Sequence, residues 1–341
     1  MINLTHTPKQ LSFRMPAEWE KHEATWLAWP HDKNSFENPF EVEDTVVEMI
    51  NCLHTGEKIK LLVNDEKEEQ RAKEKLKNAK IGLNQVVFYR VPNVDAWMRD
   101  CGPIFLVNDK TKEKAFVHWE FNAWGIKYDD LLQDKIIPEK LGKFLKLKRF
   151  RPGIVLEGGS IDVNGKGMCM TTEQCLLNKN RNPSLSKKEI ENYLKDFLGV
   201  DEILWLKEGI ENDDTDGHID DIARFVDEKT ILCSTAPTDD PNHKSLRENF
   251  EILKKDRRFN VIELPMPYYK HEGKIMPASY ANFLIANECV LVPAFKDKND
   301  NKALEIIAKC FPSKKIIGID CRKLVFGGGT IHCRTQQEPK I

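Results

Sequence analysis

The sequence predicts a mixed α/β fold in which the same order of elements recurs along the chain. Segments with helical spacing alternate with short apolar segments that are typical of strands. A polar motif follows each strand, and two apolar runs around a polar turn, which predict a hairpin, follow each motif. About five such units can be distinguished. Because one unit cannot bury its own apolar faces, we expect the units to pack around a shared axis.

The first three units follow this order with one irregularity. The first unit is broken and consists of the strand TWLAWP, a helix near 41–55 and the strand KIKLLVND. In the second, a helix over 68–80 precedes the strand NQVVFYRV, the motif DAWMRD and a hairpin over 104–119. The third runs from a helix over 131–147 through PGIVL and the motif LEGGS to the hairpin IDVNGKGMCMTT.

The later units repeat the order more clearly. A helix over 186–199, with Ser186 as its N-cap, leads to the strand DEILWLKEG, the motif NDDTDGHIDD and the hairpin IARFVDEKTILCS. A helix over 243–255 leads to the strand FNVIELP and a hairpin within SYANFLIANECVLVPAF. Finally, a helix over 301–311 leads to the strand KKIIGID and the motif FGGGTIHC.

The polar motif falls at the same place in each unit, so packing around an axis would bring the motifs together at one central site. An open doubly wound α/β sheet, which also binds ligands at its strand ends, is the alternative. A chain of 341 residues is long enough for two domains or for one large repeat domain. Since no Pro/Ser-rich linker is present, we expect a single catalytic domain over residues 1–341.

Composition argues against several classes of function. A net charge of −2, from 52 basic and 54 acidic residues, gives no electrostatic reason to expect a nucleic-acid partner. The apolar runs are too short to cross a membrane, and the first ten residues lack the apolar stretch of a secretory signal. The nine cysteines are irregularly spaced and include no C-x-x-C pair, which argues against a zinc finger and favours a reducing, cytoplasmic setting.

Cys333 is the candidate nucleophile. Three glycines shortly before it allow the backbone to approach a ligand closely or to turn sharply. A lone cysteine is more often a core or surface residue, but the glycines favour a functional role. A free thiol has a pKa near ~8.5 and needs a cationic neighbour to ionise at neutral pH.

His218, in the segment D-G-H-I-D, is the candidate acid or base. His218 and Asp220 alternate along the chain, so both could face the same side. A turn cluster capped by Asp and Asn side chains is the structural alternative. A metal site at these two residues is a further alternative, weakened because no histidine pair such as H-E-x-x-H is present.

The motifs also carry many carboxylates: Asp95, Asp100, Glu157, Asp213, Asp214, Asp216, Asp220 and Asp221. Acids beside a thiol raise its pKa and make it a poorer nucleophile. They fit a cationic substrate, because a planar guanidinium offers five donors that carboxylates can hold bidentately. The bound cation would also restore the thiolate. Cysteine, histidine and acids together therefore predict chemistry at a guanidine carbon.

Three tryptophans flank these motifs, namely Trp97, Trp119 and Trp124. They could enclose a cation through cation–π contacts, although packing in the core is the commoner role of tryptophan.

Six segments are spread over roughly residues 14 to 337: RMPAEWEKHEATWLAWP, DAWMRDCGP, FNAWG, LEGGS, DTDGHIDDIARF and GGGTIHCRTQQ. Together they resemble the agmatine deiminases, which belong to the bacterial-type peptidylarginine deiminase group of the guanidino-group-modifying superfamily. The patterns GGG-x-IHC-x-TQQ and D-T-x-G-H-x-D are specific to this resemblance, whereas EGG alone is weak.

The resemblance implies a five-bladed α/β propeller with pseudo-fivefold ββαβ repeats around a central active site. It implies Cys333 as the covalent nucleophile and His218 as the general acid and base. Asp100 and Asp220 would hold the guanidinium, and Glu157 would support either its far nitrogens or His218. The implied reaction converts agmatine to N-carbamoylputrescine and ammonia, a step toward putrescine, through a covalent thiouronium intermediate.

The resemblance further implies that Asp214 contacts the distal amine of the substrate, with Trp97 and Trp124 also in the substrate-binding set. It implies no metal, no organic cofactor and a homodimer. Two positions depart from the family pattern. Asp221 stands where many relatives carry Asn, and Arg334 stands where an apolar residue is expected. Arg334 would aid the thiolate, repel a dicationic substrate or point outward.

The four aspartates at 213–220 predict an acidic entrance, which favours agmatine over free arginine. Three basic residues near the motifs argue the other way: Arg99, Arg224 and Arg334. Deiminases of free or peptidyl arginine, an amidinotransferase, a non-catalytic polyamine-binding protein and a metal hydrolase are the alternatives. We also expect the chain to be ordered at least through Gln337 and treat glycines 327–329 as a candidate hinge.

Overall fold

The computed structural model describes residues 6–32, 35–36 and 38–341. Part of the stretch in which no secretory signal was expected therefore lies outside the described residues. The fold is mixed α/β, which confirms the predicted class. Among the described residues, the strands form five sheets of three or four strands and one two-stranded hairpin. In each of the five sheets, one strand pairs antiparallel with one neighbour and parallel with the other.

The first sheet contains the first and the last strand of the described chain. Its strands, in order across the sheet, are β18 (Gln336–Pro339), β1 (His22–Ala28), β2 (Lys58–Val63) and β3 (Val86–Arg90). Two helices connect its strands, α1 (Pro39–Leu53) and α2 (Glu66–Asn78). Gln336 of β18 pairs opposite Trp26 of β1. The segment after Cys333 therefore completes the first sheet and is ordered through Gln337, as predicted.

The second and third sheets follow the predicted hairpins. The second contains β4 (Ile104–Asn108), β5 (Glu113–Val117) and β6 (Lys148–Phe150), and the third contains β7 (Asp162–Val163), β8 (Met168–Thr172) and β9 (Glu202–Leu206). The helices that precede β6 and β9 are α5 (Ile137–Leu145) and α7 (Lys187–Leu198). Ser186 caps α7 in a capping box with Glu189, which confirms the predicted N-cap.

One predicted strand is wrong. In the third predicted unit, the strand that joins a sheet is β6, whereas PGIVL contributes only an isolated bridge between Val155 and Glu120. Pro152 follows β6 closely and has no backbone N–H to donate, so it cannot extend the ladder into this segment.

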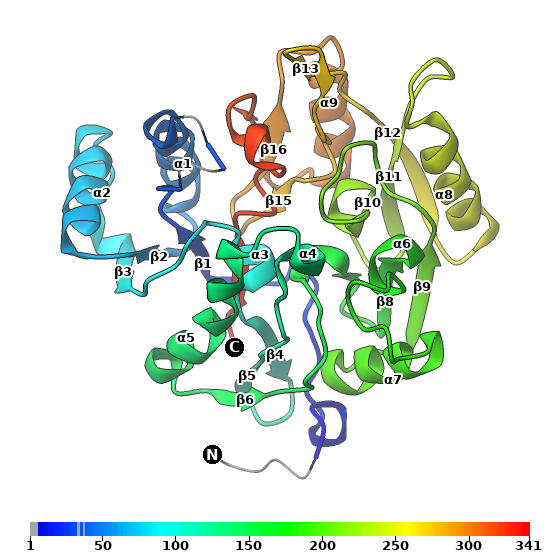
Figure 1. Ribbon diagram of the computed structural model, residues 1–341, viewed down its shortest axis with the longest axis horizontal. Helices are drawn as coiled ribbons and strands as arrows, with labels where there is room; N and C mark the ends of the chain where they lie inside the picture. The colour runs from blue at the N-terminus through cyan, green and yellow to red at the C-terminus, as the bar shows by residue number, and fades with distance from the viewer. Residues whose placement is uncertain (1–5, 33–34, 37) are drawn as a thin grey trace.

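The fourth sheet contains β10 (Ala223–Phe225), β11 (Thr230–Thr235) and β12 (Asn260–Pro265), and the fifth contains β15 (Leu284–Ile285), β16 (Cys289–Ala294) and β17 (Lys315–Asp320). Their helices are α8 (His243–Lys255) and α9 (Asp300–Cys310). A separate hairpin joins β13 (Lys270–His271) to β14 (Lys274–Ile275). In Figure 1, α2, α5, α7, α8 and α9 lie around the periphery of the molecule.

Short helices lie mainly in the connections between these elements. They are α3 (Met98–Cys101), α4 (Ala123–Ile126), α6 (Glu173–Leu176) and the 3₁₀ turns Lys9–Leu11, Leu83–Gln85, Asp130–Ile136, Gly158–Ser160, Ile219–Asp221 and Leu324–Gly327. Several of them coincide with the polar motifs, because α3 holds the end of DAWMRD and two of the 3₁₀ turns hold GGS and IDD.

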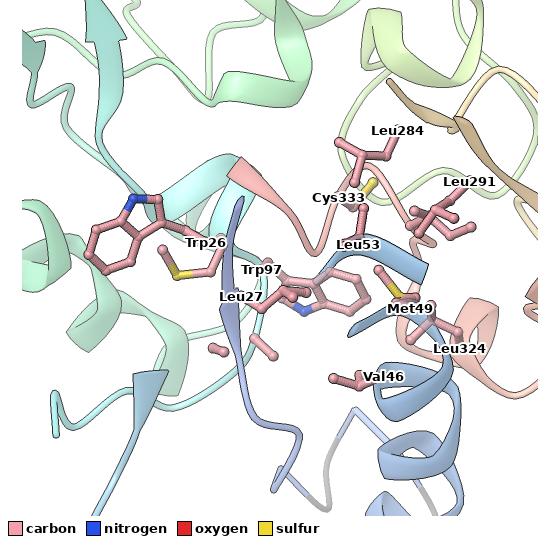
Figure 2. Close-up of a cluster of buried hydrophobic side chains, with 14 of the residues drawn as sticks. Trp26, Leu27, Val46, Met49, Leu53, Trp97, Leu284, Leu291, Leu324 and Cys333 are labelled. Carbon is pink, nitrogen blue, oxygen red and sulfur yellow. The ribbon is translucent and has the colours of Figure 1, made fainter. Parts of the chain in front are cut away.

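The largest apolar cluster joins the first sheet, α1 and the fifth sheet, and Figure 2 shows part of it. Its labelled members are Trp26, Leu27, Val46, Met49, Leu53, Trp97, Leu284, Leu291, Leu324 and Cys333. Cys333 and Trp97 thus lie at the edge of a packed core. All nine cysteines are unpaired, and seven of them are buried. Within the described part of the chain, no helix has the length and apolar character needed to cross a membrane.

Candidate active site

The polar motifs meet around one pocket of about 320 Å³, here called the inner pocket. Its lining residues are Trp97, Asp100, Trp124, Tyr128, Asp214, Thr215, Gly327, Gly328, Gly329 and Cys333. A wider space of about 490 Å³, the outer hollow, shares six of these residues and continues from it. Side chains far apart in the sequence, Asp100, Asp214 and Cys333, therefore face one space.

Cys333 lines the inner pocket and is 4% exposed. Its thiol lies 3.7 Å from Oδ2 of Asp220, and its sulfur accepts a hydrogen bond from Nδ2 of Asn282 at 3.0 Å. Burial, together with the charges of Asp220, Asp221 and Asp100, raises the pKa of the Cys333 thiol well above its usual value. This is the effect expected of clustered acids, and it leaves the thiol dependent on a bound cation for ionisation.

Asn282 was not predicted as a site residue. It is fully buried, and its Oδ1 accepts from the hydroxyl of Thr330 at 2.7 Å and from the backbone N–H of His332 at 3.1 Å. A backbone N–H can only donate, so the amide atom that faces it must be the oxygen. The Nδ2 group therefore faces the sulfur as a donor, which favours the thiolate. Asn282 lies in SYANF, a segment that sequence reasoning assigned only to a hairpin.

The glycines before Cys333 are required by close packing. A Cβ on Gly329 would lie 2.9 Å from the sulfur of Cys333, and a Cβ on Gly327 would lie 2.8 Å from the ring of Trp97. Gly328 has a φ of 93°, in the left-handed region that favours glycine. A side chain on Gly327 or Gly329 would displace the thiol or the aromatic wall. Their role as a hinge stays a prediction.

Asp100 and Asp220 approach each other beside Gly159. Asp100 accepts from the backbone N–H of Gly159 at 2.9 Å and from Nε1 of Trp124 at 3.0 Å. Oδ2 of Asp220 lies 2.6 Å from Nδ1 of His332, whereas its Oδ1 is buried without a hydrogen-bond partner among the described residues. Glycine is required at position 159, because a Cβ there would lie 2.9 Å from Asp100.

The two carboxylates differ in pKa. Burial raises the pKa of Asp100 to about 6; the charge of His218 opposes burial, and the charges of Asp220 and Glu157 reinforce it. Burial also opposes the ionised form of Asp220, but the hydrogen bond and charge of His332, with further cations nearby, lower the pKa of Asp220.

His218 is fully buried between Asp100 and Glu157. Its Nδ1 lies 3.7 Å from Asp100 and its Nε2 lies 3.9 Å from Glu157, both longer than hydrogen bonds. Burial disfavours the imidazolium, yet the charge of Asp100 and the contacts with Cys175 and Glu157 raise the pKa of His218 well above its usual value. These contacts favour the protonated ring, whose two nitrogens have no hydrogen-bond partner in the described part of the chain.

Arg181 connects Glu157 to the loop that carries His218, and sequence reasoning missed it. Its Nε donates to Glu157 at 2.6 Å, and its Nη atoms donate to Asp216 at 2.8 Å and to the carbonyl of Thr215 at 2.9 Å. Burial raises the pKa of Glu157, but the charge of Arg181 and the contacts with His218 outweigh burial and lower it. Glu157 therefore stays ionised beside His218.

The aspartates at 213–220 do not form the acidic entrance together. Asp214 lines both the inner pocket and the outer hollow. Asp213 instead accepts from backbone N–H groups of its own loop, and Asp216 forms ion pairs behind that loop. Two further acids line the outer hollow, Asp32 and Asp130. The negative charge at the entrance therefore comes from three separate segments.

Three aromatic rings line the inner pocket: Trp97, Trp124 and Tyr128. Their polar edges donate to Asp95, Asp100 and Asp214 at 2.6, 3.0 and 2.7 Å, respectively. A carboxylate thus fixes the orientation of each ring. Trp119 does not belong to this set, because it packs against Phe197 in a separate core cluster.

Arg334 does not point outward. It is fully buried, and its guanidinium lies 5.5 Å from the ring of Phe36 and 5.4 Å from that of Trp97. Burial lowers the pKa of Arg334 to about 10, against the charges of Asp95 and Cys333. Arg334 therefore supports the wall formed by Trp97 from behind.

Asp221 is also buried, and burial with the charges of Asp220 and Asp213 raises the pKa of Asp221 well above its usual value. A neutral carboxylic acid at this position resembles asparagine in shape and in hydrogen bonding. The departure at Asp221 from the family pattern is therefore chemically small.

Two buried groups have ligand spacing that could hold a metal ion. One consists of Glu157, Cys175 and His218, and the other of Asp220, Asp221 and Cys333; in each group the ligand atoms lie within 4.8 Å of one another. Both coincide with the residues assigned to guanidine chemistry, so the absence of a metal from that chemistry stays a prediction.

Comparison with known proteins gives one consistent result. The family model for Porphyromonas-type peptidyl-arginine deiminase matches residues 14–339. A Legionella pneumophila protein named "Putative agmatine deiminase" is 39% identical over 350 residues, which cover 99% of this chain and 98% of the relative. The structure of the Enterococcus faecalis agmatine deiminase matches with a TM-score of 0.90 and 34% identity over 99% of this chain and 98% of its own. That of a C. jejuni agmatine deiminase with substrate bound matches with a TM-score of 0.87 and 34% identity over 96% of each chain.

Proposed function

The chain belongs to the Porphyromonas-type peptidyl-arginine deiminase family, and on this premise we propose that it is an agmatine deiminase, which hydrolyses agmatine to N-carbamoylputrescine and ammonia. The observation that carries this proposal is the inner pocket, which is lined by the buried thiol of Cys333, by Asp100 and, toward the outer hollow, by Asp214. Asp220 lies 3.7 Å from the thiol and His218 lies 3.7 Å from Asp100, so both adjoin this lining. This combination fits a flat cation with a second positive charge at its far end.

In the proposed complex, the guanidinium enters between Asp100 and Asp220. Oδ1 of Asp220 is buried and unpartnered among the described residues, so it is available to accept from a guanidinium nitrogen. Asp100, already held by Gly159 and Trp124, presents a fixed carboxylate on the other side. The bound cation lowers the pKa of the Cys333 thiol, which the surrounding acids raise in the free protein.

The reaction proceeds in two halves. The thiolate of Cys333 attacks the guanidinium carbon, and the carbon–nitrogen bond breaks as His218 donates a proton to the departing ammonia. Neutral His218 then takes a proton from water, which attacks the thiouronium carbon, and the carbon–sulfur bond breaks to release the carbamoyl product. Glu157, ionised by its contact with Arg181, stabilises the protonated form of His218.

The lining of the entrance favours agmatine over free arginine. Among the described residues, no lysine or arginine lines the inner pocket or the outer hollow. Arg99 and Arg224 are buried behind the site, where they bind Gln337 and Glu18, and Arg334 lies behind Trp97. A substrate carboxylate would find no cationic partner, whereas a substrate ammonium would meet Asp214.

Assays of ammonia release with agmatine, arginine and a blocked arginyl peptide test the proposal. We expect turnover of agmatine, much slower turnover of the other two, and background rates for Cys333→Ser. Comparable turnover of arginine would refute the substrate assignment. Amidine transfer to an added amine without release of ammonia would instead identify an amidinotransferase, and full activity of Cys333→Ser would remove the nucleophile from the mechanism.

We further propose that the five sheets are the blades of a pseudo-fivefold α/β propeller within one catalytic domain over residues 1–341. The shared strand pairing of the five sheets and the meeting of their connecting motifs at the inner pocket support this arrangement. A cytoplasmic homodimer is the proposed form of the enzyme, and sedimentation of the purified protein tests its oligomeric state.

A further inference from the structure

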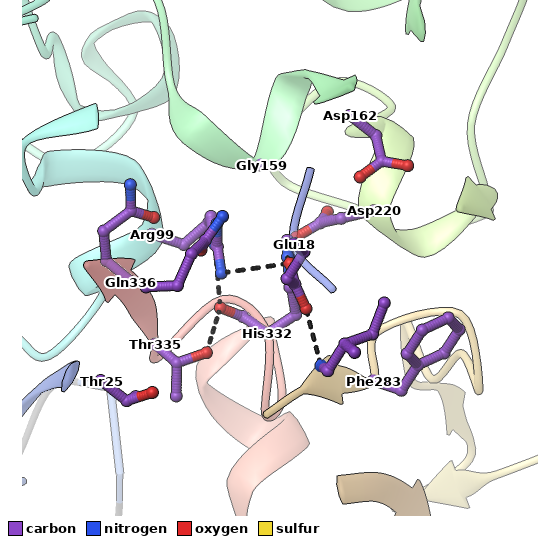
Figure 3. Close-up of polar contacts among 12 residues, drawn as sticks. Glu18, Thr25, Arg99, Gly159, Asp162, Asp220, Phe283, His332, Thr335 and Gln336 are labelled. Carbon is purple, nitrogen blue, oxygen red and sulfur yellow. Dashed lines mark hydrogen bonds and ion pairs between the residues drawn. The ribbon is translucent and has the colours of Figure 1, made fainter. Parts of the chain in front are cut away.

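A chain of buried polar groups lies behind the inner pocket and takes no direct part in the reaction proposed above. Nδ1 of His332 lies 2.6 Å from Asp220, and its Nε2 lies 2.8 Å from Oε2 of Glu18. Figure 3 shows Glu18, Asp220 and His332 close together, with a dashed line between Arg99 and Glu18. Glu18 comes from the segment before β1 and Asp220 from the motif after β9, so His332 joins two distant parts of the chain.

Both ring nitrogens of His332 lie at hydrogen-bond distance from a carboxylate oxygen. A neutral imidazole has one N–H and one lone pair, and the lone pair would face a carboxylate at hydrogen-bond distance. Both carboxylates are ionised. The charges of Arg224 and His332 lower the pKa of Glu18 despite its burial, and the pKa of Asp220 is also lowered. A ring that donates from both nitrogens therefore fits this geometry best.

The charges around this ring are balanced. Three carboxylates, Glu18, Asp162 and Asp220, are in contact with three cations, Arg99, Arg224 and His332. Arg224 binds Glu18 at 2.8 Å and Asp162 at 3.3 Å. Glu18 is also anchored by the backbone N–H of Ile285 at 2.7 Å. His332 thus lies in a rigid, charge-balanced network, with Asp220 at the end nearest the pocket.

We propose that His332 is a positioning residue for guanidinium binding, which holds Oδ2 of Asp220 so that Oδ1 remains directed to the substrate. This inference rests on the proposed function, because it takes Asp220 as a ligand of the guanidinium. Without His332, Oδ2 of Asp220 would lose its charge-assisted partner. The carboxylate would then be free to turn toward the sulfur of Cys333, which already lies 3.7 Å away.

Two substitutions separate positioning of Asp220 from simple structural support. The side-chain nitrogen of asparagine lies near the position of histidine Nδ1, and that of glutamine lies near Nε2. His332→Asn therefore keeps a donor to Asp220 and loses the one to Glu18, whereas His332→Gln does the reverse. Agmatine affinity is measured by calorimetry in the Cys333→Ser background, and kcat and KM are measured with Cys333 present.

We expect His332→Gln to weaken agmatine binding about tenfold to a hundredfold, the loss typical of one hydrogen bond to a charged group. His332→Asn should stay within about threefold of the parent, with KM following the same order. Glu18→Gln serves as the control, because a neutral His332 can still donate from Nδ1 to Asp220, and we expect it to bind better than His332→Gln.

The reverse order, with His332→Asn the weaker binder, would show that His332 acts through Glu18 and would overturn the inference. Equal affinities in variants with equal thermal unfolding temperatures would overturn it as well. The proposed function fails separately if the unaltered enzyme releases no ammonia from agmatine. Absence of agmatine binding by Cys333→Ser would overturn both.

Discussion

His332 and His218 are both buried between carboxylates, and they are held differently. The nitrogens of His332 lie 2.6 and 2.8 Å from their oxygens, whereas those of His218 lie 3.7 and 3.9 Å from theirs. The region around His332 is charge-balanced and hydrogen-bonded. In the region around His218, both ring nitrogens and Oε2 of Glu157 are unpartnered among the described residues.

This difference in hydrogen bonding indicates two different roles: His332 holds its neighbours in place, whereas His218 can transfer a proton. A ring whose two nitrogens both make short hydrogen bonds to carboxylates would give up one of them by losing a proton, so His332 is suited to hold its neighbour in place. A ring held only by longer-range attraction keeps its protons available for a substrate or a water molecule. The neighbouring carboxylates differ accordingly, because the pKa of Asp220 is lowered and that of Asp100 is raised to about 6.

The largest effect on turnover is expected from substitution of His218, the residue proposed to transfer the proton. His218→Asn should reduce kcat for agmatine by about 10²–10⁴-fold, the range typical of a lost general acid and base. The affinity of the Cys333→Ser background for agmatine should change little, because Asp100 and Asp220 hold the guanidinium. Steady-state ammonia release and calorimetry measure the two quantities. A variant that keeps kcat but loses affinity would assign His218 to binding and erase the contrast with His332.

A pH dependence should come from the carboxylate beside His218. The guanidinium is charged throughout pH 5–8, so kcat/KM should fall as Asp100 is protonated below its pKa of about 6. The matched control is Asp134→Asn. Burial also raises the pKa of Asp134 to about 6, but this residue accepts from the backbone of Val94 and Asp95 outside the pocket lining. A profile that stays flat to pH 5 would contradict the role of Asp100.

The same raised pKa affects stability with a definite sign. Asp100 is protonated more readily in the folded protein than in the unfolded chain, so its contribution to stability is present at low pH and is lost as the pH rises through about 6. Asp220, whose pKa is lowered, contributes in the opposite sense, since its stabilisation is lost as the pH falls. Chemical denaturation of Asp100→Asn at pH 5 and pH 8 measures the first of these contributions.

The smallest effect on turnover is expected at Glu338. This residue belongs to a polar cluster that is as tightly hydrogen-bonded as that of His332 but lies outside the site. Glu338 of β18 accepts from Lys60, from Lys114 and from Nε1 of Trp26 at 2.6, 2.6 and 2.9 Å. Glu338→Gln should lower the free energy of unfolding by about 1–3 kcal/mol through partners left unsatisfied, with kcat/KM per folded molecule unchanged. Urea denaturation and ammonia release test both. A large loss of kcat/KM would mean that tight bonding anywhere in the fold affects the chemistry.

The sequence predicted most elements of the fold and named candidate reacting groups whose roles stay predictions, but it did not predict the residues that support them. Periodicity identified the helices α7 and α8 because each has a regular apolar face, and motif order identified Cys333, His218, Asp100 and Asp220. Asn282 and Arg181 could not be predicted, because each acts through contacts with residues distant in the chain. Glu18 and His332 lay within recognised motifs, but spacing alone cannot show that one bonds to the other. The strand in PGIVL failed for a local reason, the proline beside β6.

The pairing of β18 with β1 has a consequence for the time at which activity appears during synthesis. Cys333 lies beyond the other proposed site residues in the chain, and β18 begins three residues after it. The ribosome must therefore release this segment before β18 can pair with β1 and before Cys333 can reach the site. Until then, β1 has an unpaired edge of the kind that promotes aggregation. A chain that lacks this segment would therefore lack activity and would keep the edge of β1 exposed.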